Sequence, residues 1–134
     1  NFRGAGGSAG RHDNGRGEVE DLQAAIAWLR SEHDVAHLWL GGYSFGASVV
    51  WQTLARIPEP ERILLVAPPV GVMAFPERNL SCPVDVFMGD EDEFADVDAL
   101  AAWRGVRSHL IAGANHFFLG QADTLRRRIE QAIS

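Results

Sequence analysis

The chain has 134 residues, of which 46% are hydrophobic and 22% are charged, a composition that suits one domain with a sizeable core. Twelve basic residues against eighteen acidic ones give a formal net charge of -6, which argues against the basic face of a nucleic-acid-binding protein. The single cysteine, Cys82, excludes an internal disulfide, and no cluster of cysteine and histidine has the spacing of a zinc site.

The first half of the chain predicts a loop, a helix, a strand and a second helix. Residues 1–17 are rich in glycine, as is typical of a long loop. From Glu18 to His33, apolar residues recur at helical spacing, and acidic residues occupy the first turn, where the helix dipole favours them. Residues 37–42 form a short apolar run that ends in two glycines, and prolines stop the apolar stretch 45–57 that follows. We therefore expect a strand, a tight turn and a buried helix in this order.

The second half of the chain alternates strands with helices. Two continuous aliphatic runs are typical of buried strands in a parallel sheet, and the later segments show strand and helical patterns in turn. The expected elements are strands at 62–67, 84–89 and 107–113 and helices at 97–104 and 122–133. This alternation predicts an α/β fold with a mainly parallel sheet, as a single domain over residues 1–134.

The segment GGYSFGAS places Ser44 in a G-x-S-x-G pattern between an expected strand and an expected helix. Glycines on both sides permit a sharp turn that lifts the serine clear of the backbone. The same turn puts the N–H of Phe45 at a helix N-terminus, where negative charge is stabilised. The pattern thus predicts a nucleophile at Ser44 and an oxyanion donor at Phe45. The alternative is that Ser44 is only a small residue in a glycine-rich bend.

Acidic residues and a histidine follow two of the later strands, in the segments MGDEDEF and GANHFF. Open α/β sheets place their ligands and catalytic groups at the carboxyl ends of strands. The order of Ser44, an acid and then His116 is one in which catalytic triads occur. Either Asp90 or Asp92 could be the acid, and His116 could instead cap a loop beside Asn115.

Several aromatic residues have two interpretations each. Phe117 and Phe118 directly follow the predicted base, so they either wall an acyl pocket or pack in the core. The tryptophans are dispersed along the chain and are interpreted as packing residues rather than as a stacking platform. They are Trp28, Trp39, Trp51 and Trp103.

The chain resembles the carboxy-terminal two-thirds of an α/β-hydrolase. Within that superfamily it is similar to small, lidless bacterial hydrolases, mostly uncharacterised, near the dienelactone-hydrolase-like group. The matching segments are NFRGAGGSAGRHDNGRGEVED, GYSFG, VAPP, GDEDEF and GANHFF. Dienelactone hydrolase itself has a cysteine at the elbow, so Ser44 points away from that activity.

The resemblance implies a role for each candidate site residue. Ser44 is the nucleophile, His116 the general base, Asp92 the carboxylate that orients His116, and the amide of Phe45 an oxyanion donor. Asp92 is preferred to Asp90 because the family pattern is glycine, two residues and then aspartate.

The resemblance also implies a partial domain. Such families have further strands before the loop that opens this chain, and their second oxyanion amide follows the third strand. We therefore expect the chain to lack the first strands, and we expect the missing third strand to leave a gap in the middle of the sheet. The short connection between the runs 62–67 and 84–89 leaves no room for a lid.

The sequence therefore predicts a serine hydrolase that cleaves a small ester or related acyl bond through an acyl-enzyme, without a cofactor or metal. The alternative is a non-catalytic binding or interaction module on the same scaffold. The expected partner is a small-molecule substrate, with no nucleic acid. No membrane is expected, since no apolar run approaches the roughly 20 residues that span a bilayer. A lone cysteine fits a cytoplasmic setting. Unpaired sheet edges promote association, so a homo-oligomer is a possible state of the chain.

Overall fold

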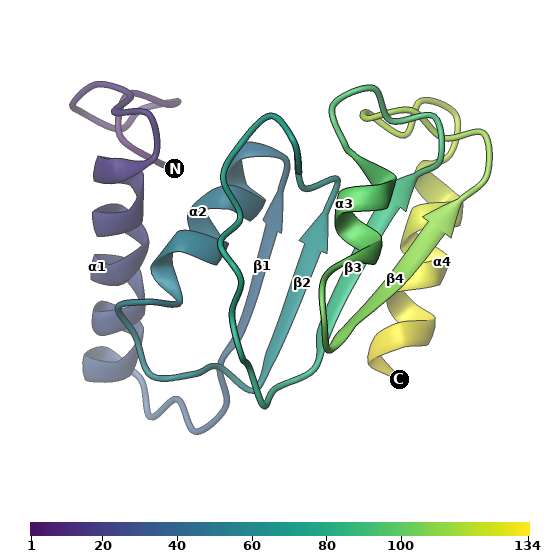
Figure 1. Cartoon of the computed structure of the whole chain (residues 1–134). Coiled ribbons are helices and arrows are strands. Elements are labelled where there is room, and N and C mark those ends of the chain that lie inside the picture. The colour runs from purple at the N-terminus through teal and green to yellow at the C-terminus, as the bar shows by residue number, and fades with distance from the viewer.

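The centre of the molecule is a sheet of parallel strands, in a computed structural model that describes all residues from 1 to 134. The strands are β1 (Trp39–Tyr43), β2 (Arg62–Val66), β3 (Val84–Gly89) and β4 (Val106–Ile111). They lie in the order β1-β2-β3-β4, and each pairs in parallel with the next (Figure 1). Every residue of β3 is buried, as expected for a strand inside a parallel sheet with both faces covered. The predicted α/β fold with a parallel sheet is confirmed.

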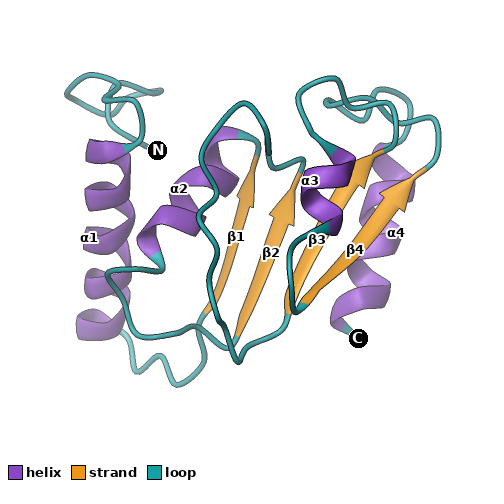
Figure 2. Ribbon diagram, in the orientation of Figure 1, coloured by secondary structure: helices purple, strands orange, loops and turns teal.

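Helices cover both faces of this sheet (Figure 2). They are α1 (Arg16–Glu32), α2 (Phe45–Thr53), α3 (Val97–Ala101) and α4 (Ala122–Ile133). Three of them, α1, α2 and α3, lie on one side, and α4 lies on the other. Neighbouring residues of a strand point to opposite faces of the sheet. Leu65 of β2 packs in the same core cluster as Val50 of α2. Its neighbour Val66 packs in the other cluster, together with Leu125 of α4. None of the helices is both long and apolar enough to cross a membrane.

Two helices are shorter than the sequence predicts. The helix α2 ends at Thr53 rather than at residue 57, and α3 ends at Ala101 rather than at residue 104. In both cases the amides that follow bond to carbonyls three residues back, the tighter pattern of a last helical turn. After α3, Gly105 adopts a φ of 71° and turns the chain toward β4. The other predicted boundaries agree to within about two residues.

The expected gap in the middle of the sheet is wrong. All four strands are consecutive neighbours, so the sheet is continuous from β1 to β4. No gap lies between the four strands, and the sheet edge formed by the strand that precedes Ser44 is open. That edge is the side of β1 away from β2, where the backbone has no strand partner.

The long loop before α1 is anchored by two carboxylates. Glu18, which is fully buried, accepts hydrogen bonds from the amides of Asp13 at 2.6 Å and Gly15 at 2.9 Å. Burial opposes the charge of this carboxylate, but the amide bonds outweigh it, so the pKa of Glu18 lies below its usual value. Asp21 binds the guanidinium of Arg3 with contacts of 2.9 and 3.2 Å. The loop is thereby fastened to α1, beside the start of α2.

Candidate active site

Ser44 lies on a sharp turn between β1 and α2. Its φ of 51° and ψ of -116° are unusual for a residue with a side chain, and its amide bonds to the carbonyl of Val66 at 2.9 Å. A Cβ on Gly42 would lie 2.4 Å from the carbonyl oxygen of Gly46, so the first turn of α2 passes too close for any other residue at position 42. The first glycine of the pattern thus lets the helix start directly over the end of the strand.

A continuous chain of hydrogen bonds joins Ser44, His116 and Asp92. The Ser44 Oγ lies 2.8 Å from His116 Nε2, and His116 Nδ1 lies 2.9 and 3.0 Å from the two carboxylate oxygens of Asp92. Both bonds form when Nδ1 carries the proton and donates to Asp92, which leaves Nε2 to accept from the serine hydroxyl. His116 is 5% exposed and Asp92 7% exposed, so water competes weakly for these contacts. The structure therefore brings together three residues that three different strand ends supply.

Asp90 has a different partner. Its carboxylate accepts a hydrogen bond from the amide of Gly113 at 2.8 Å, which braces the loop after β4. The adjoining turns pack closely, because a Cβ on Gly89 would lie 2.0 Å from the carbonyl oxygen of Ala114. The turn after β3 and the loop after β4 thus pack directly against each other, which places Asp92 beside His116.

The cap of the loop after β4 is Asn115, not His116. The Asn115 side-chain oxygen accepts from the amides of Phe117 at 3.1 Å and Leu119 at 3.2 Å. This leaves the His116 ring free to face Ser44. Phe118 is 4% exposed and packs in the core cluster on the α4 face, whereas Phe117 is 62% exposed and stands perpendicular to the His116 ring. Phe118 therefore packs in the core, whereas Phe117 lies exposed beside the histidine.

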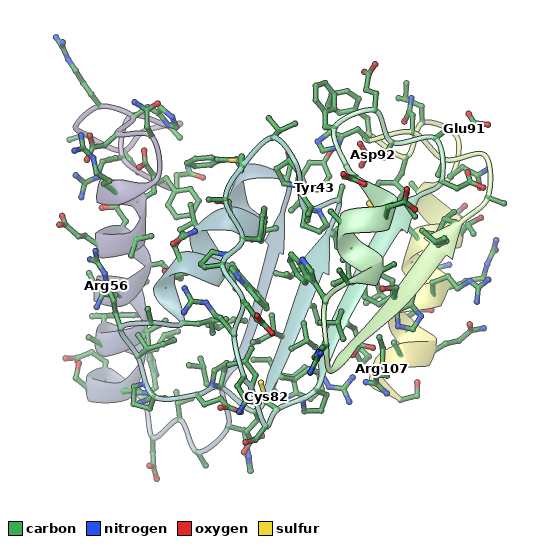
Figure 3. The ribbon with its side chains drawn as sticks, viewed as in Figure 1. Tyr43, Arg56, Cys82, Glu91, Asp92 and Arg107 are labelled. Atoms are coloured by element: carbon green, nitrogen blue, oxygen red, sulfur yellow. The ribbon has the colours of Figure 1, made fainter.

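Tyr43 and Phe94 also surround the histidine, and the sequence interpretation missed both. The Tyr43 hydroxyl donates to the His116 carbonyl at 3.1 Å, and the Phe94 ring lies 4.8 Å from the imidazole. Burial, followed by the nearby charge of Asp92, raises the pKa of Tyr43. Tyr43 and Asp92 lie at the same end of the sheet, opposite to Cys82 and Arg107 (Figure 3). The available signal for Tyr43 was its place directly before Ser44, at the end of a strand.

The amide of Phe45 is the first of α2, a position without an intrahelical acceptor. An oxyanion formed at a carbonyl bonded to Ser44 would meet this donor and the positive end of the helix. The Phe45 ring lies 5.0 Å from the ring of His12 and 6.1 Å from that of Phe2, so the long loop borders the site. No group of three or more histidine, cysteine or acidic side chains is arranged to hold a metal ion.

Known proteins share this architecture. A family model described as "alpha/beta hydrolase fold" matches residues 1–68. An uncharacterised protein of Rickettsia prowazekii is 35% identical over 148 residues, which cover 99% of this chain and 62% of that protein. A solved structure from Xanthomonas campestris, described as an α/β serine hydrolase without a lid, is 33% identical with a TM-score of 0.90, over 99% of this chain and 63% of that one. An α/β serine hydrolase homologue from Coxiella burnetii is 32% identical with a TM-score of 0.89, over 100% and 67%.

The present chain thus spans about 62% of the length of the curated relative and 63% of the Xanthomonas structure. The family model matches half of the chain, and these solved structures share its fold. The chain belongs to the α/β-hydrolase family.

Proposed function

We propose that this protein is a serine hydrolase that cleaves a small ester or a related acyl bond through an acyl-enzyme. The observation that carries the proposal is the hydrogen-bond chain from Ser44 through His116 to Asp92. A serine hydroxyl is a weak nucleophile unless a base removes its proton, and His116 is in hydrogen-bond contact with it.

In the proposed reaction, Ser44 Oγ attacks the carbonyl carbon while its proton passes to His116 Nε2. The carbonyl π electrons move to the oxygen, which then faces the Phe45 amide. Collapse of this intermediate expels the alcohol, which takes the proton from His116 and leaves an acyl-serine. Water, deprotonated by His116, releases the acid and restores Ser44. Asp92 stays ionised throughout, because its part is to orient and stabilise the imidazolium.

Small substrates are proposed because little covers Ser44. The connection between β2 and β3, residues 67–83, contains no helix. The aromatic side chains around His116 are open to solvent: Tyr43 is 46% exposed, Phe94 39% and Phe117 62%. Such a rim would contact a short acyl or alcohol group but would not enclose a long chain.

Only one oxyanion donor, the Phe45 amide, is proposed within these residues. Losing one of two such donors typically slows catalysis by about 10²–10³. We therefore expect the 134-residue chain by itself to acylate slowly, so a probe that reports one covalent event is a better test than repeated turnover.

The test is reaction with a fluorophosphonate probe, followed by intact-protein mass spectrometry and peptide mapping. The expected result is a single adduct on Ser44 that Ser44→Ala abolishes. Ser48→Ala is the matched control, because Ser48 lies one turn further along α2 and is 7% exposed, and it should retain the adduct. An adduct that persists in Ser44→Ala would contradict the proposal. No adduct on a chain of full family length would favour the non-catalytic module, whereas no adduct on these 134 residues would show only that the oxyanion site is incomplete.

A further inference from the structure

Three aromatic side chains that are far apart in the sequence meet on the face of the sheet that α2 and α3 cover. Trp51 of α2 and Trp103, just after α3, stack with ring centroids 4.7 Å apart and an interplanar angle of 24°. The ring of Phe75, from the connection between β2 and β3, lies 5.3 Å from that of Trp103. The Trp51 indole donates to the carbonyl of Pro76 at 2.8 Å, which ties this connection to α2. We call Trp51, Phe75 and Trp103 the aromatic cluster.

A cavity of about 380 Å³ is lined by the aromatic cluster, by the connection between β2 and β3, and by the segment that follows α3. This volume falls within the range of small-molecule sites, which is about 300–1,000 Å³. Its charged lining residues are Glu77, Arg78 and Arg104, so cationic groups outnumber anionic ones. The cavity therefore combines flat apolar walls with a positive rim.

Arg78 is the most unusual residue of this cavity. Its guanidinium carbon lies 5.9 Å from the Trp51 ring centroid, and its buried Nε has no hydrogen-bond partner. No other buried side-chain nitrogen or oxygen in the chain is left without one. Burial lowers the pKa of Arg78, and its guanidinium forms no ion pair with any carboxylate. The terminal nitrogens of this guanidinium, which lines the cavity, have neither an ion pair nor a hydrogen-bond partner within the chain, so a carboxylate in the cavity would pair with them.

We propose that this cavity is a second ligand site that binds a small aryl carboxylate. The aromatic ring would pack against the aromatic cluster, and the carboxylate would accept hydrogen bonds from Arg78 and from Arg104 at the rim. The planar fork of a guanidinium matches a carboxylate, and aromatic side chains favour flat apolar ligands. A cationic ligand is disfavoured by the two arginines, and a fully hydrated inorganic anion would gain nothing from the apolar walls.

This site is separate from the proposed catalytic residues. Trp51 lies seven residues beyond Ser44, which corresponds to about 10 Å along an α-helix. None of the charged or aromatic residues of the cavity hydrogen-bonds to Ser44, Asp92 or His116. The proposal therefore does not depend on hydrolase activity, and binding alone can test it.

The first experiment compares benzoate, neutral benzamide and inorganic phosphate as ligands of the unaltered chain, by isothermal titration calorimetry. We expect benzoate to bind saturably and benzamide to bind with an affinity at least about tenfold lower. Equimolar phosphate should not displace benzoate. Benzamide that binds as well as benzoate would overturn the role of the carboxylate. Phosphate that displaces benzoate at equal concentration would overturn the role of the ring, and absence of benzoate binding would overturn the site.

The second experiment locates the ligand. Arg78→Gln should weaken benzoate binding about tenfold, since a hydrogen bond to a charged group is lost. Arg56→Gln is the matched control: Arg56 is an exposed arginine that lines a different cavity, between α1 and α2, and its variant should bind benzoate as the unaltered chain does. Equal affinity in Arg78→Gln would overturn the assignment, as would loss of binding in Ser44→Ala. If Arg78→Gln does not fold by circular dichroism, the ligand comparison on the unaltered chain still decides.

Discussion

Individual carboxylates show how a single residue's partner determines its role. Asp90 and Asp92 are two residues apart in one turn, and composition or spacing does not separate them. The structure does, because the Asp92 carboxylate lies 2.9 Å from His116 Nδ1, whereas that of Asp90 binds the Gly113 amide at 2.8 Å. The resemblance to the family favours Asp92 as the acid, and its contact with His116 supports that proposal.

A pair of isosteric variants tests this distinction. Asp92→Asn should slow labelling of Ser44 by the fluorophosphonate probe about 100-fold or more, because the uncharged amide no longer stabilises the imidazolium. Asp90→Asn should keep the labelling rate within about threefold, since Asp90 braces a loop and does not touch the histidine. The measurement is the rate of adduct formation by mass spectrometry. Equal rates in the two variants would remove Asp92 from the mechanism.

At the scale of elements, the junction of β1 and α2 depends on how closely the helix starts over the strand. Gly42 and Gly46 are the two glycines of the G-x-S-x-G pattern, and the pattern alone treats them alike. A Cβ at Gly42 would meet the Gly46 carbonyl oxygen at 2.4 Å, whereas a Cβ at Gly46 would meet nothing within 4 Å. The close approach of α2 to β1 therefore requires a glycine at position 42, whereas no contact within the chain requires one at position 46.

The two glycines should respond differently to the same substitution. Gly42→Ala forces the strand and the helix apart and should reduce the free energy of unfolding by about 1–3 kcal/mol. Gly46→Ala should lower the free energy of unfolding by less than about 0.5 kcal/mol, or raise it slightly, because alanine has a higher helix propensity than glycine. Urea denaturation measures both. A larger loss in Gly46→Ala than in Gly42→Ala would show that the close approach is not the limiting contact.

At the scale of the whole molecule, a buried carboxylate links three strands and the last helix. Asp85 of β3 is fully buried and contacts Arg62 of β2 at 3.0 Å and both Arg107 and His109 of β4 at 2.8 and 2.9 Å. Arg62 also donates to the carbonyl of Ala132 in α4 at 2.8 Å. Arg107 of this cluster lies toward the end of the sheet opposite to Tyr43 and Asp92 (Figure 3).

Removal of this carboxylate should destabilise the whole fold. Asp85→Ala leaves Arg62, whose side chain is 18% exposed, without its charge partner, and we expect a loss of about 3 kcal/mol in the free energy of unfolding. Asp123→Ala, at an α4 side chain that is 84% exposed, should change stability by less than about 0.5 kcal/mol. Thermal and urea unfolding provide the measurement. A small effect of Asp85→Ala would mean that water replaces the carboxylate at the two arginines.

The sequence by itself determined the features that depend on neighbouring residues. Apolar periodicity and proline or glycine at element ends predicted every helix and strand, and the pattern around Ser44 located the elbow, because local sterics limit which residues such turns accept. Tertiary structure alone decided which residues from distant segments touch. The sequence indicates Trp51 and Trp103 only as dispersed packing residues, yet they stack and form one cluster with Phe75, and the sheet has no gap where one is expected. Such contacts follow from how strands order and helices cross in space, which no local pattern encodes.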